Sequence, residues 1–341
     1  MKIAIIVNPL IPVPPEHYGG IERIIFMLIQ ELVIMGHNVT LYAHQDSVPG
    51  CPLVPYREHA QYSTGDFLRI NFLTAKIAFA GFDLVHTFGR MSNIALLMFS
   101  GIKKIVSYQL PPTVLRVKNA AGLARNGTLQ FTACSNFIAG QIKDFCKVTT
   151  IYNGVDIRDY DFQETVQPDA PLVFLGRIQK EKGTAIAIKL ALQTGNKLVI
   201  AGNVPMEAIH QQYFEEEVKP FIDGITIRYI GPVNNAEKNV LLGNAKAFLM
   251  PVMWDEPFGI VMAEALACGT PVIGFNRGAL PEIIENGKNG FLCRDYEEMC
   301  QAVQNAGAID RHQCRETARI KFSAEVIARH YEELYKQMTG K

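Results

Sequence analysis

Short apolar segments alternate with longer amphipathic segments from one end of the chain to the other. In the first half, this pattern predicts a helix over 21–36 that ends at Gly36. The strands that it predicts there are 2–7, 38–43, 84–88, 104–108, 131–135 and 149–153. They are short and continuously apolar, which is typical of parallel strands that helices cover on both faces. We therefore expect a doubly wound α/β sheet.

The same alternation starts again in the second half, and a long helix over 322–338 follows it. The strands predicted there are 171–176, 197–202, 225–231, 247–252 and 270–275. The segment between the two series, 153–171, is polar and irregular and begins with the turn-forming pair Asn153-Gly154. The sequence therefore predicts two Rossmann-like domains, 1–157 and 158–321. Ligands bind at the carboxyl ends of the strands in such sheets, so two domains that face each other would form the ligand cleft.

The composition fits a globular enzyme, with 48% hydrophobic and 19% charged residues. The formal net charge is +0, so no overall field indicates a nucleic-acid or membrane binder. Residues 1–160 contain 14 Lys and Arg against 10 Asp and Glu, a net charge of +4, which leaves −4 for the remainder. This small asymmetry suggests that the first half meets an anionic acceptor or surface.

The cysteines and the N-terminus bear on the cellular location. Seven cysteines are scattered singly without a CxxC pair, which argues against a disulfide framework and favours a reducing cytoplasm. The first apolar run ends in prolines, is too short to span a membrane and lacks a signal-peptide cleavage pattern. We expect a cytoplasmic protein, and peripheral contact with the inner membrane face stays open.

The loop after the first predicted strand, within NPLIPVPPEHYGGIER (8–23), ends in Gly19 and Gly20 at the start of a helix. Two glycines allow a ligand to approach the backbone, and the helix N-terminus offers free N–H groups to an anion. The stretch is neither GxGxxG nor a Walker loop. A plain strand-to-helix turn is the alternative.

The loop LGRIQKEKG (175–183) follows the first strand of the second domain and contains Arg177 and Lys182. A guanidinium and an ammonium at the end of a strand suit a diphosphate, which the first binds bidentately and the second as a point charge. A solvated charged loop is the alternative.

Two glutamates, Glu256 and Glu264, lie eight residues apart in the mostly apolar stretch EPFGIVMAEALACGTPVIG. We expect a helix that begins near Pro257 or Phe258 and ends at Gly269. Eight residues at about 100° each would leave Glu264 about 80° round from Glu256, so that both could face one ligand. The alternative pairs Glu256 with the helix dipole and Glu264 with a salt-bridge partner.

The free N–H groups at the start of this helix, those of Gly259, Ile260 and Val261, would point to the same place. Two carboxylates for hydroxyl groups beside a backbone site for phosphate suit a polyhydroxylated anion. Trp254, two residues before Glu256, could line a sugar pocket or pack under the loop.

The E-x7-E pattern of Glu256 and Glu264 resembles the signature of the retaining family-4 glycosyltransferases of the GT-B fold. Other motifs agree in order and spacing, namely YGGIER (18–23), DLVHTF (83–88), NGVD (153–156), GRIQKEKG (176–183), IAGNV (200–204) and GPVNNAEK (231–238). The resemblance spans nearly the whole chain and implies that a final helix, 322–341, packs back on the first domain. One departure is Tyr152, which stands where the family's junction usually has proline.

The resemblance also implies roles for individual residues. Arg177 and Lys182 would hold the donor diphosphate, and Glu264 would accept hydrogen bonds from the donor ribose. Glu256 would bind and orient the transferred sugar. His86, at the tip of a strand of the first domain, would contact this sugar near the reaction centre; a structural histidine is the alternative. The remaining donor-binding residues would be Gly19, Gly20, Gly202, Val233, Lys238, Phe258, Gly259, Ile260 and Val261.

These roles imply transfer of a sugar from a nucleotide-diphosphate sugar with retained configuration, with neither a metal nor a further cofactor. Asn235 in the base-facing loop favours UDP over GDP, because an acid there would suit guanine better. The acceptor could be a glycan, a lipid-linked molecule or a small molecule. The alternatives are a sugar-phosphate synthase of the same fold and a non-catalytic nucleotide-sugar-binding partner of another transferase. A dehydrogenase is disfavoured because no GxGxxG is followed by a suitably spaced acid.

Overall fold

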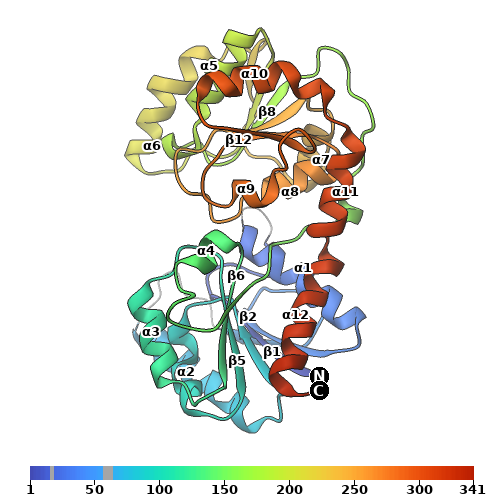
Figure 1. The fold of residues 1–341 in the computed structure, drawn as a ribbon. Coiled ribbons are helices and arrows are strands. Elements are labelled where there is room, and N and C mark those ends of the chain that lie inside the picture. Colours follow the sequence, from blue (N-terminus) through green and yellow to red (C-terminus); the bar gives the residue numbers. More distant parts are fainter. Residues whose placement is uncertain (16–18, 57–63) are drawn as a thin grey trace. The chain divides into compact units, whose positions relative to one another are not determined.

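The computed structural model describes residues 1–15, 19–56 and 64–341, which form two compact units. Unit 1 comprises residues 1–154 and 324–341, and unit 2 comprises residues 155–323. Each unit has its own parallel sheet with helices on both faces (Figure 1). The predicted fold class, two Rossmann-like α/β domains, is confirmed. Among the described residues, no helix combines the length and the apolar character needed to cross a bilayer.

Unit 1 is built around a seven-stranded sheet with the strand order β3-β2-β1-β4-β5-β6-β7. Its strands are β1 (Lys2–Ile6), β2 (Asn38–His44), β3 (Leu53–Tyr56), β4 (Leu84–Thr87), β5 (Lys103–Tyr108), β6 (Leu129–Ala133) and β7 (Val148–Thr150). Its helices are α1 (Gly20–Ile34), α2 (Thr64–Ala75), η1 (Lys76–Phe79), η2 (Met91–Phe99), α3 (Val114–Leu123), α4 (Asn136–Gly140) and α12 (Ala324–Thr339).

Alternating strand residues feed two separate cores on the two faces of this sheet. In β1, Ile3 and Ile5 pack with α1 and α12, whereas Ala4 and Ile6 pack with α2, η2 and α3. This division follows from the two-residue period of a strand. The final helix α12 therefore belongs to unit 1, and it buries Tyr331 and Tyr335 there.

Unit 2 is built around a six-stranded sheet with the strand order β10-β9-β8-β11-β12-β13. Its strands are β8 (Leu172–Leu175), β9 (Leu198–Ala201), β10 (Ile227–Tyr229), β11 (Ala247–Met250), β12 (Val272–Phe275) and β13 (Gly290–Cys293). Its helices are η3 (Ile157–Asp159), η4 (Lys180–Lys182), α5 (Thr184–Thr194), α6 (Ala208–Tyr213), η5 (Phe214–Val218), η6 (Lys219–Phe221), α7 (Asn235–Gly243), α8 (Ile260–Ala267), α9 (Leu280–Ile283), α10 (Tyr296–Asn305), η7 (Ala306–Ala308) and α11 (Arg311–Lys321).

The strand order of unit 2 reverses direction between β8 and β11. From β8 the chain builds outward through β9 to β10, and it then returns to place β11 on the other side of β8. At such a switch point the two loops at the carboxyl ends of neighbouring strands leave in opposite directions and open a crevice for ligands. The loops after β8 and β11 therefore border the expected ligand crevice of unit 2.

Helix α11 fixes the end of α8 that is remote from this crevice. Arg311 is buried, and its guanidinium donates to five oxygens, those of the Gln163, Gly243, Ala245 and Cys268 carbonyls and the Thr270 hydroxyl. Gly243 ends α7 and Cys268 follows the last residue of α8, so the positive charge lies at two helix C-termini, where the helix dipole favours it.

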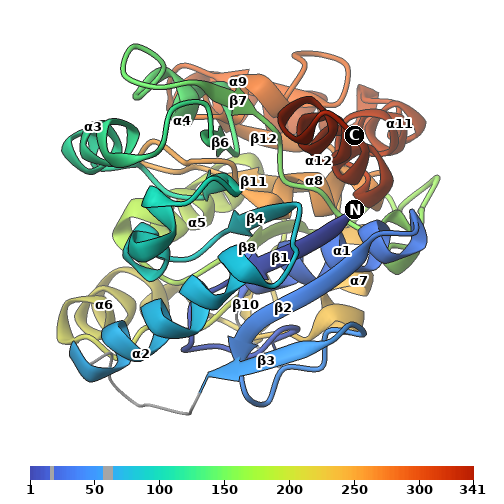
Figure 2. The same ribbon diagram turned by 90° about the horizontal axis from the view of Figure 1, so that it is seen from below.

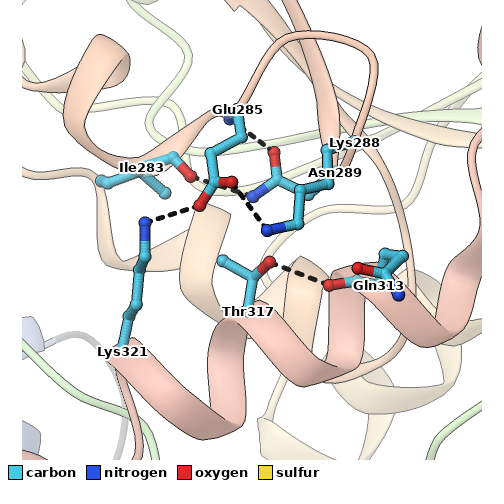
Figure 3. Close-up of polar contacts among 7 residues, drawn as sticks. All are labelled: Ile283, Glu285, Lys288, Asn289, Gln313, Thr317 and Lys321. Carbon is cyan, nitrogen blue, oxygen red and sulfur yellow. Dashed lines mark hydrogen bonds and ion pairs between the residues drawn. The ribbon is translucent and has the colours of Figure 1, made fainter.

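The C-terminal half of α11 is attached to the loop between α9 and β13 (Figure 3). Lys321 Nζ donates to Glu285 at 2.5 Å, and Lys288 donates to the same carboxylate at 2.9 Å. These two contacts lower the pKa of Glu285. The buried side chain of Asn289 closes the loop by accepting from the Glu285 amide and donating to the Ile283 carbonyl.

Two strands, β3 and β13, were not among those predicted. Both are at the edge of a sheet, where the hydrophobic signal of a strand is weak. β3 contains Pro55 and is mostly half-exposed, and β13 begins with Gly290. Proline and glycine in short segments favour a loop assignment from sequence.

Candidate functional site

Glycines bring the loop after β8 into close contact with its neighbours on both sides. A Cβ on Gly183 would lie 2.0 Å from the carbonyl oxygen of Pro251, just after β11. A Cβ on Gly202, just after β9, would lie 1.8 Å from the carbonyl oxygen of Gly176. Both glycines also have positive φ angles, 79° and 136°. The three carboxyl-end loops therefore meet with backbone against backbone, which a larger residue at either position would prevent.

Lys182 and Glu256 meet in this place, one from each loop of the switch point. Lys182 Nζ donates to Glu256 Oε2 at 2.6 Å, and both side chains are largely buried. The indole N–H of Trp254 donates to the same oxygen at 2.9 Å, and Lys182 Nζ lies 4.7 Å from the centroid of the Trp254 ring. Trp254 thus fixes the orientation of both members of the ion pair.

The backbone around Glu256 is held by the loop that follows β12. The Ala279 amide donates to the Glu256 carbonyl at 2.9 Å. A Cβ on Gly278 would lie 2.5 Å from both the nitrogen and the carbonyl oxygen of Glu256. Glu256 is 8% exposed and is fixed by both its backbone and its side chain.

Glu264 lies in a second ion pair, inside the helix layer of unit 2. Its Oε1 accepts from Tyr160 at 2.8 Å and also from Lys238 Nζ on α7. Burial, and secondarily the charge of Glu264, raises the pKa of Tyr160 and raises that of the Cys268 thiol to about 12. At neutral pH both groups therefore stay protonated, and Tyr160 acts as a hydrogen-bond donor to the carboxylate.

The start of α8 differs from the prediction. The helix begins at Ile260, with Gly259 at φ 75° as its N-cap residue, so Pro257 and Phe258 precede it. Glu256 lies in the loop ahead of the helix, as the expected start near Pro257 or Phe258 already implied. The residues between Glu256 and Ile260 are not helical, however, so the rotation of about 80° expected between the two glutamates is wrong. The positive φ of Gly259 explains the late start, because glycine can turn the chain sharply into the first helical turn.

The N-terminus of α8 has no side-chain cap, and Gly259, Ile260 and Val261 are partly exposed. The side chain of Phe258 is buried against Phe322, with ring centroids 5.7 Å apart, so this side chain does not face a ligand. The helix end combines unsatisfied N–H groups with the positive end of the dipole. It lies directly after the loop that carries Glu256.

The other predicted donor-binding residues of unit 2 lie at the carboxyl ends of neighbouring strands. Arg177 is partly exposed, two residues beyond β8. Gly202 follows β9, and its carbonyl accepts from the Tyr229 hydroxyl at 2.8 Å. Val233 is partly exposed after β10, one residue before Asn234, which caps α7 in a capping box with Glu237. Asn235 is the first residue of α7 rather than a loop residue.

His86 is not at the tip of a strand, as predicted, but inside β4. Its side chain is 0% exposed. Nδ1 lies 2.6 Å from the Tyr335 hydroxyl of α12, and Nε2 lies 2.6 Å from the Ser107 hydroxyl of β5. Burial lowers the pKa of His86 to about 3. Both ring nitrogens are engaged within unit 1, so in this structure His86 is a structural residue and cannot contact a sugar.

Gly19 and Gly20 lie at the start of α1, as the loop motif predicts. Gly19 precedes the helix without a side-chain cap, and a Cβ there would lie 2.7 Å from Pro15. Gly20 is the first helical residue, and a Cβ there would meet open space. Residues 16–18 of the predicted loop lie outside the described part of the chain.

Sequence reasoning missed Gln109, which follows the last residue of β5. Its side-chain nitrogen and oxygen are both shielded from solvent, and within the described part of the chain neither atom has a hydrogen-bond partner. Buried amides nearly always have partners, so this one is free to bond a group that is not part of the chain. A polar residue directly after a parallel strand was the signal that could have indicated it.

Two family models match consecutive parts of the chain. The model for glycosyltransferase family 4 matches residues 18–159, and the model for glycosyl transferases group 1 matches residues 156–320. The curated relative spore coat protein SA of Bacillus subtilis (strain 168) is 25% identical in an alignment that covers 89% of this chain and 88% of that protein.

Solved structures resemble the whole chain. AviGT4, a glycosyltransferase involved in avilamycin A biosynthesis, is 25% identical over 99% of this chain and 98% of its own, with a TM-score of 0.74. Anabaena HepE in complex with UDP-glucose has the same TM-score at 15% identity, over 99% of this chain and 100% of its own. At that identity the second likeness shows the fold alone.

Proposed function

The chain belongs to the family-4-type glycosyltransferases of the GT-B fold, and we propose that it takes its sugar from a nucleotide-diphosphate donor and transfers it with retained configuration. The observation that carries the proposal is the meeting of Lys182 and Glu256 at the switch point of unit 2. This pair provides a cation for phosphate and a carboxylate for sugar hydroxyls, next to the uncapped N-terminus of α8.

In this proposal Lys182 exchanges its partner when the donor binds. The diphosphate takes over the ammonium group, joined by Arg177 and the amides of Gly259, Ile260 and Val261. Glu256, released from Lys182 but still held by Trp254, then accepts from hydroxyl groups of the transferred sugar. The pair keeps two charges from being buried without a partner while the site is empty.

Glu264 accepts from the ribose hydroxyls in the same proposal, held in place by Tyr160 and Lys238. The base then lies against the loops after β9 and β10, near Gly202 and Val233. We favour uridine because Asn235 offers no carboxylate to guanine, and HepE, of the same fold, was solved with UDP-glucose. GDP remains the competitor to test.

The reaction breaks the bond between the anomeric carbon and the diphosphate oxygen and forms a bond to the acceptor oxygen on the same face. Negative charge grows on the leaving diphosphate as the sugar becomes oxocarbenium-like, so Arg177, Lys182 and the α8 N-terminus stabilise the transition state more than the ground state. The acceptor proton passes to the departing diphosphate oxygen. Positive charge from the chain itself serves where a metal would otherwise be needed.

Gln109 belongs in the proposal as a residue of unit 1 that donates to or accepts from a hydroxyl of the acceptor. Its unpartnered amide is the supporting observation.

Three experiments test the proposal. A thermal-shift screen of UDP, GDP and ADP identifies the base, because a ligand at 100 times its Kd adds about 2.7 kcal/mol to the free energy of unfolding. NMR of the product's anomeric proton tests the stereochemistry, and an inverted product contradicts the mechanism. Hydrolysis of the donor without acceptor separates an enzyme from a non-catalytic binding partner, which would bind nucleotide without turnover.

A further inference from the structure

One helix layer of unit 1 exposes large apolar side chains on its outer surface. The layer consists of α2, η1, η2 and α3, which cover the same core on one face of the sheet. Figures 1 and 2 show α2 and α3 on the side of this sheet away from α1 and α12. The exposed apolar residues of the layer are Leu68, Phe72, Phe79, Leu96, Phe99, Leu115 and Leu123.

Three of these residues are phenylalanines, whose large apolar rings are normally buried. Phe79 is 93% exposed, and Phe72 and Phe99 are each 66% exposed. Leu68 and Phe72 are four residues apart on α2 and so share one face of that helix. Large apolar side chains exposed together on one helix layer indicate an interaction site.

The charges on the same layer have one sign. Its exposed charged residues are basic, namely Arg69, Lys76, Arg116 and Lys118, with Arg125 directly after α3. Residues 64–127 contain eight Lys and Arg, of which Lys104 in β5 is buried, against two acids. Of these acids, Asp66 is buried and Asp83 is ion-paired with Lys341.

Exposed phenylalanines and leucines between cations, with no exposed acid among the described residues of these four helices, are typical of a surface that lies on an anionic membrane. A protein interface is generally depleted in Lys at its centre, whereas here Lys76 lies between Phe72 and Phe79. We propose that the surface of α2, η1, η2 and α3 docks on an anionic lipid bilayer, with the phenylalanines in the interface and the cations at the headgroups. The inference does not depend on the transferase proposal, because it concerns other residues in the other unit.

Vesicle co-sedimentation of the full chain tests the docking surface. We expect binding to phosphatidylcholine–phosphatidylglycerol (1:1) vesicles, no measurable binding to phosphatidylcholine alone, and loss of binding in 0.5 M NaCl. The triple variant Phe72→Ser, Phe79→Ser, Phe99→Ser and the triple variant Arg69→Gln, Lys76→Gln, Arg116→Gln should each weaken the partition constant at least tenfold.

The matched control for the apolar variant is Met206→Ser, Ile209→Ser, Ile225→Ser, three exposed side chains of unit 2, which should leave vesicle binding unchanged. The circular dichroism spectrum and the thermal unfolding midpoint without nucleotide should be the same in wild type and in both test variants, which shows that they fold and keeps this test separate from that of the transferase. Absence of binding to anionic vesicles overturns the proposal. A wild-type dimer in light scattering that the phenylalanine variant abolishes, without lipid binding, overturns it in favour of contact between two copies.

Discussion

The two units share one architecture but differ in the buried polar clusters that their strands and loops position. Unit 2 gathers charged side chains, Lys182 with Glu256 and Lys238 with Glu264, in its carboxyl-end loops and helix layer. Unit 1 buries a neutral network in the middle of its sheet, where His86 lies between the hydroxyls of Tyr335 and Ser107.

This difference shows why a histidine in a strand and a glutamate in a loop deserve different interpretations. The network of unit 1 is satisfied within the fold, so it contributes to stability and has no capacity left for a ligand. The pairs of unit 2 join groups whose partners a phosphate or a hydroxyl can replace. The fold alone does not locate a functional site. The accessible polar groups at the strand ends locate it.

The substitution Lys182→Met should have the largest effect on the unit 2 side of the comparison. Removing one electrostatic stabiliser of the leaving group lowers turnover about 10²–10³-fold, which is measured as UDP release from the donor. Lys180→Met is the matched control, because Lys180 is in the same η4 turn but pairs with Glu217 at the surface. Equal losses in the two variants contradict the assignment of Lys182.

Replacing Glu264 by Gln should weaken nucleotide binding about 10–100-fold, because hydrogen bonds to a charged acceptor contribute roughly 1.5–3 kcal/mol. The variant keeps the size of the side chain, and its affinity for UDP is measured by calorimetry. Glu285→Gln, at another ion-paired carboxylate of unit 2, is the control and should bind UDP as wild type does. If Glu264→Gln also binds like wild type, Glu264 serves only to pair Lys238.

Acid should destabilise unit 1 through His86. Its pKa is about 3 in the folded chain against an ordinary value near 6.5, so the unfolded state binds more protons and the stabilisation is lost as pH falls from 6.5 towards 3. We expect a loss of about 2 kcal/mol between pH 8 and pH 5.

The chain's single tryptophan allows this loss to be assigned to one unit. Trp254 lies in unit 2, so its fluorescence follows the unfolding of that unit, whereas circular dichroism follows both. The midpoint of the dichroism transition in urea should fall more with pH than that of the fluorescence transition. In His86→Phe the difference between the two probes should shrink, and an unchanged difference contradicts the role of His86.

The smallest expected effect belongs to Gln109. Removing a buried amide without partners and keeping its volume, as in Gln109→Met, should raise the free energy of unfolding by about 1 kcal/mol. The same change should raise the KM for the acceptor several-fold if the amide bonds an acceptor hydroxyl. A variant that is more stable and fully active shows that the amide has no ligand.

Much of the fold could be predicted because its central strands are continuously apolar, as in β1 and β11. The edge strands β3 and β13 could not, since Pro55 and Gly290 give loop signals that pairing with one neighbour overrides. Chain geometry likewise shifted the start of α8, because only the structure reveals the positive φ of Gly259.

The positions of Lys182 and Glu256 in loops at the carboxyl ends of strands could be expected from the rule that ligand loops follow parallel strands. The role of Tyr160 and the burial of His86 could not, because both depend on side chains more than 100 residues away. Tyr160 reaches Glu264 from η3's end, and His86 is enclosed by Tyr335 of α12. Long-range packing of this kind has no local sequence pattern.

The most direct test of the central claim, that the carboxyl-end loops of unit 2 form a nucleotide diphosphate site, is a calorimetric titration of UDP into wild type, Lys182→Met and Lys197→Met. Lys197 immediately precedes β9, at the opposite end of the same sheet, and pairs with Asp169. We predict a Kd at least tenfold higher for Lys182→Met and an unchanged Kd for Lys197→Met. Equal affinities in all three proteins, or stronger dependence on Lys197, would contradict the account.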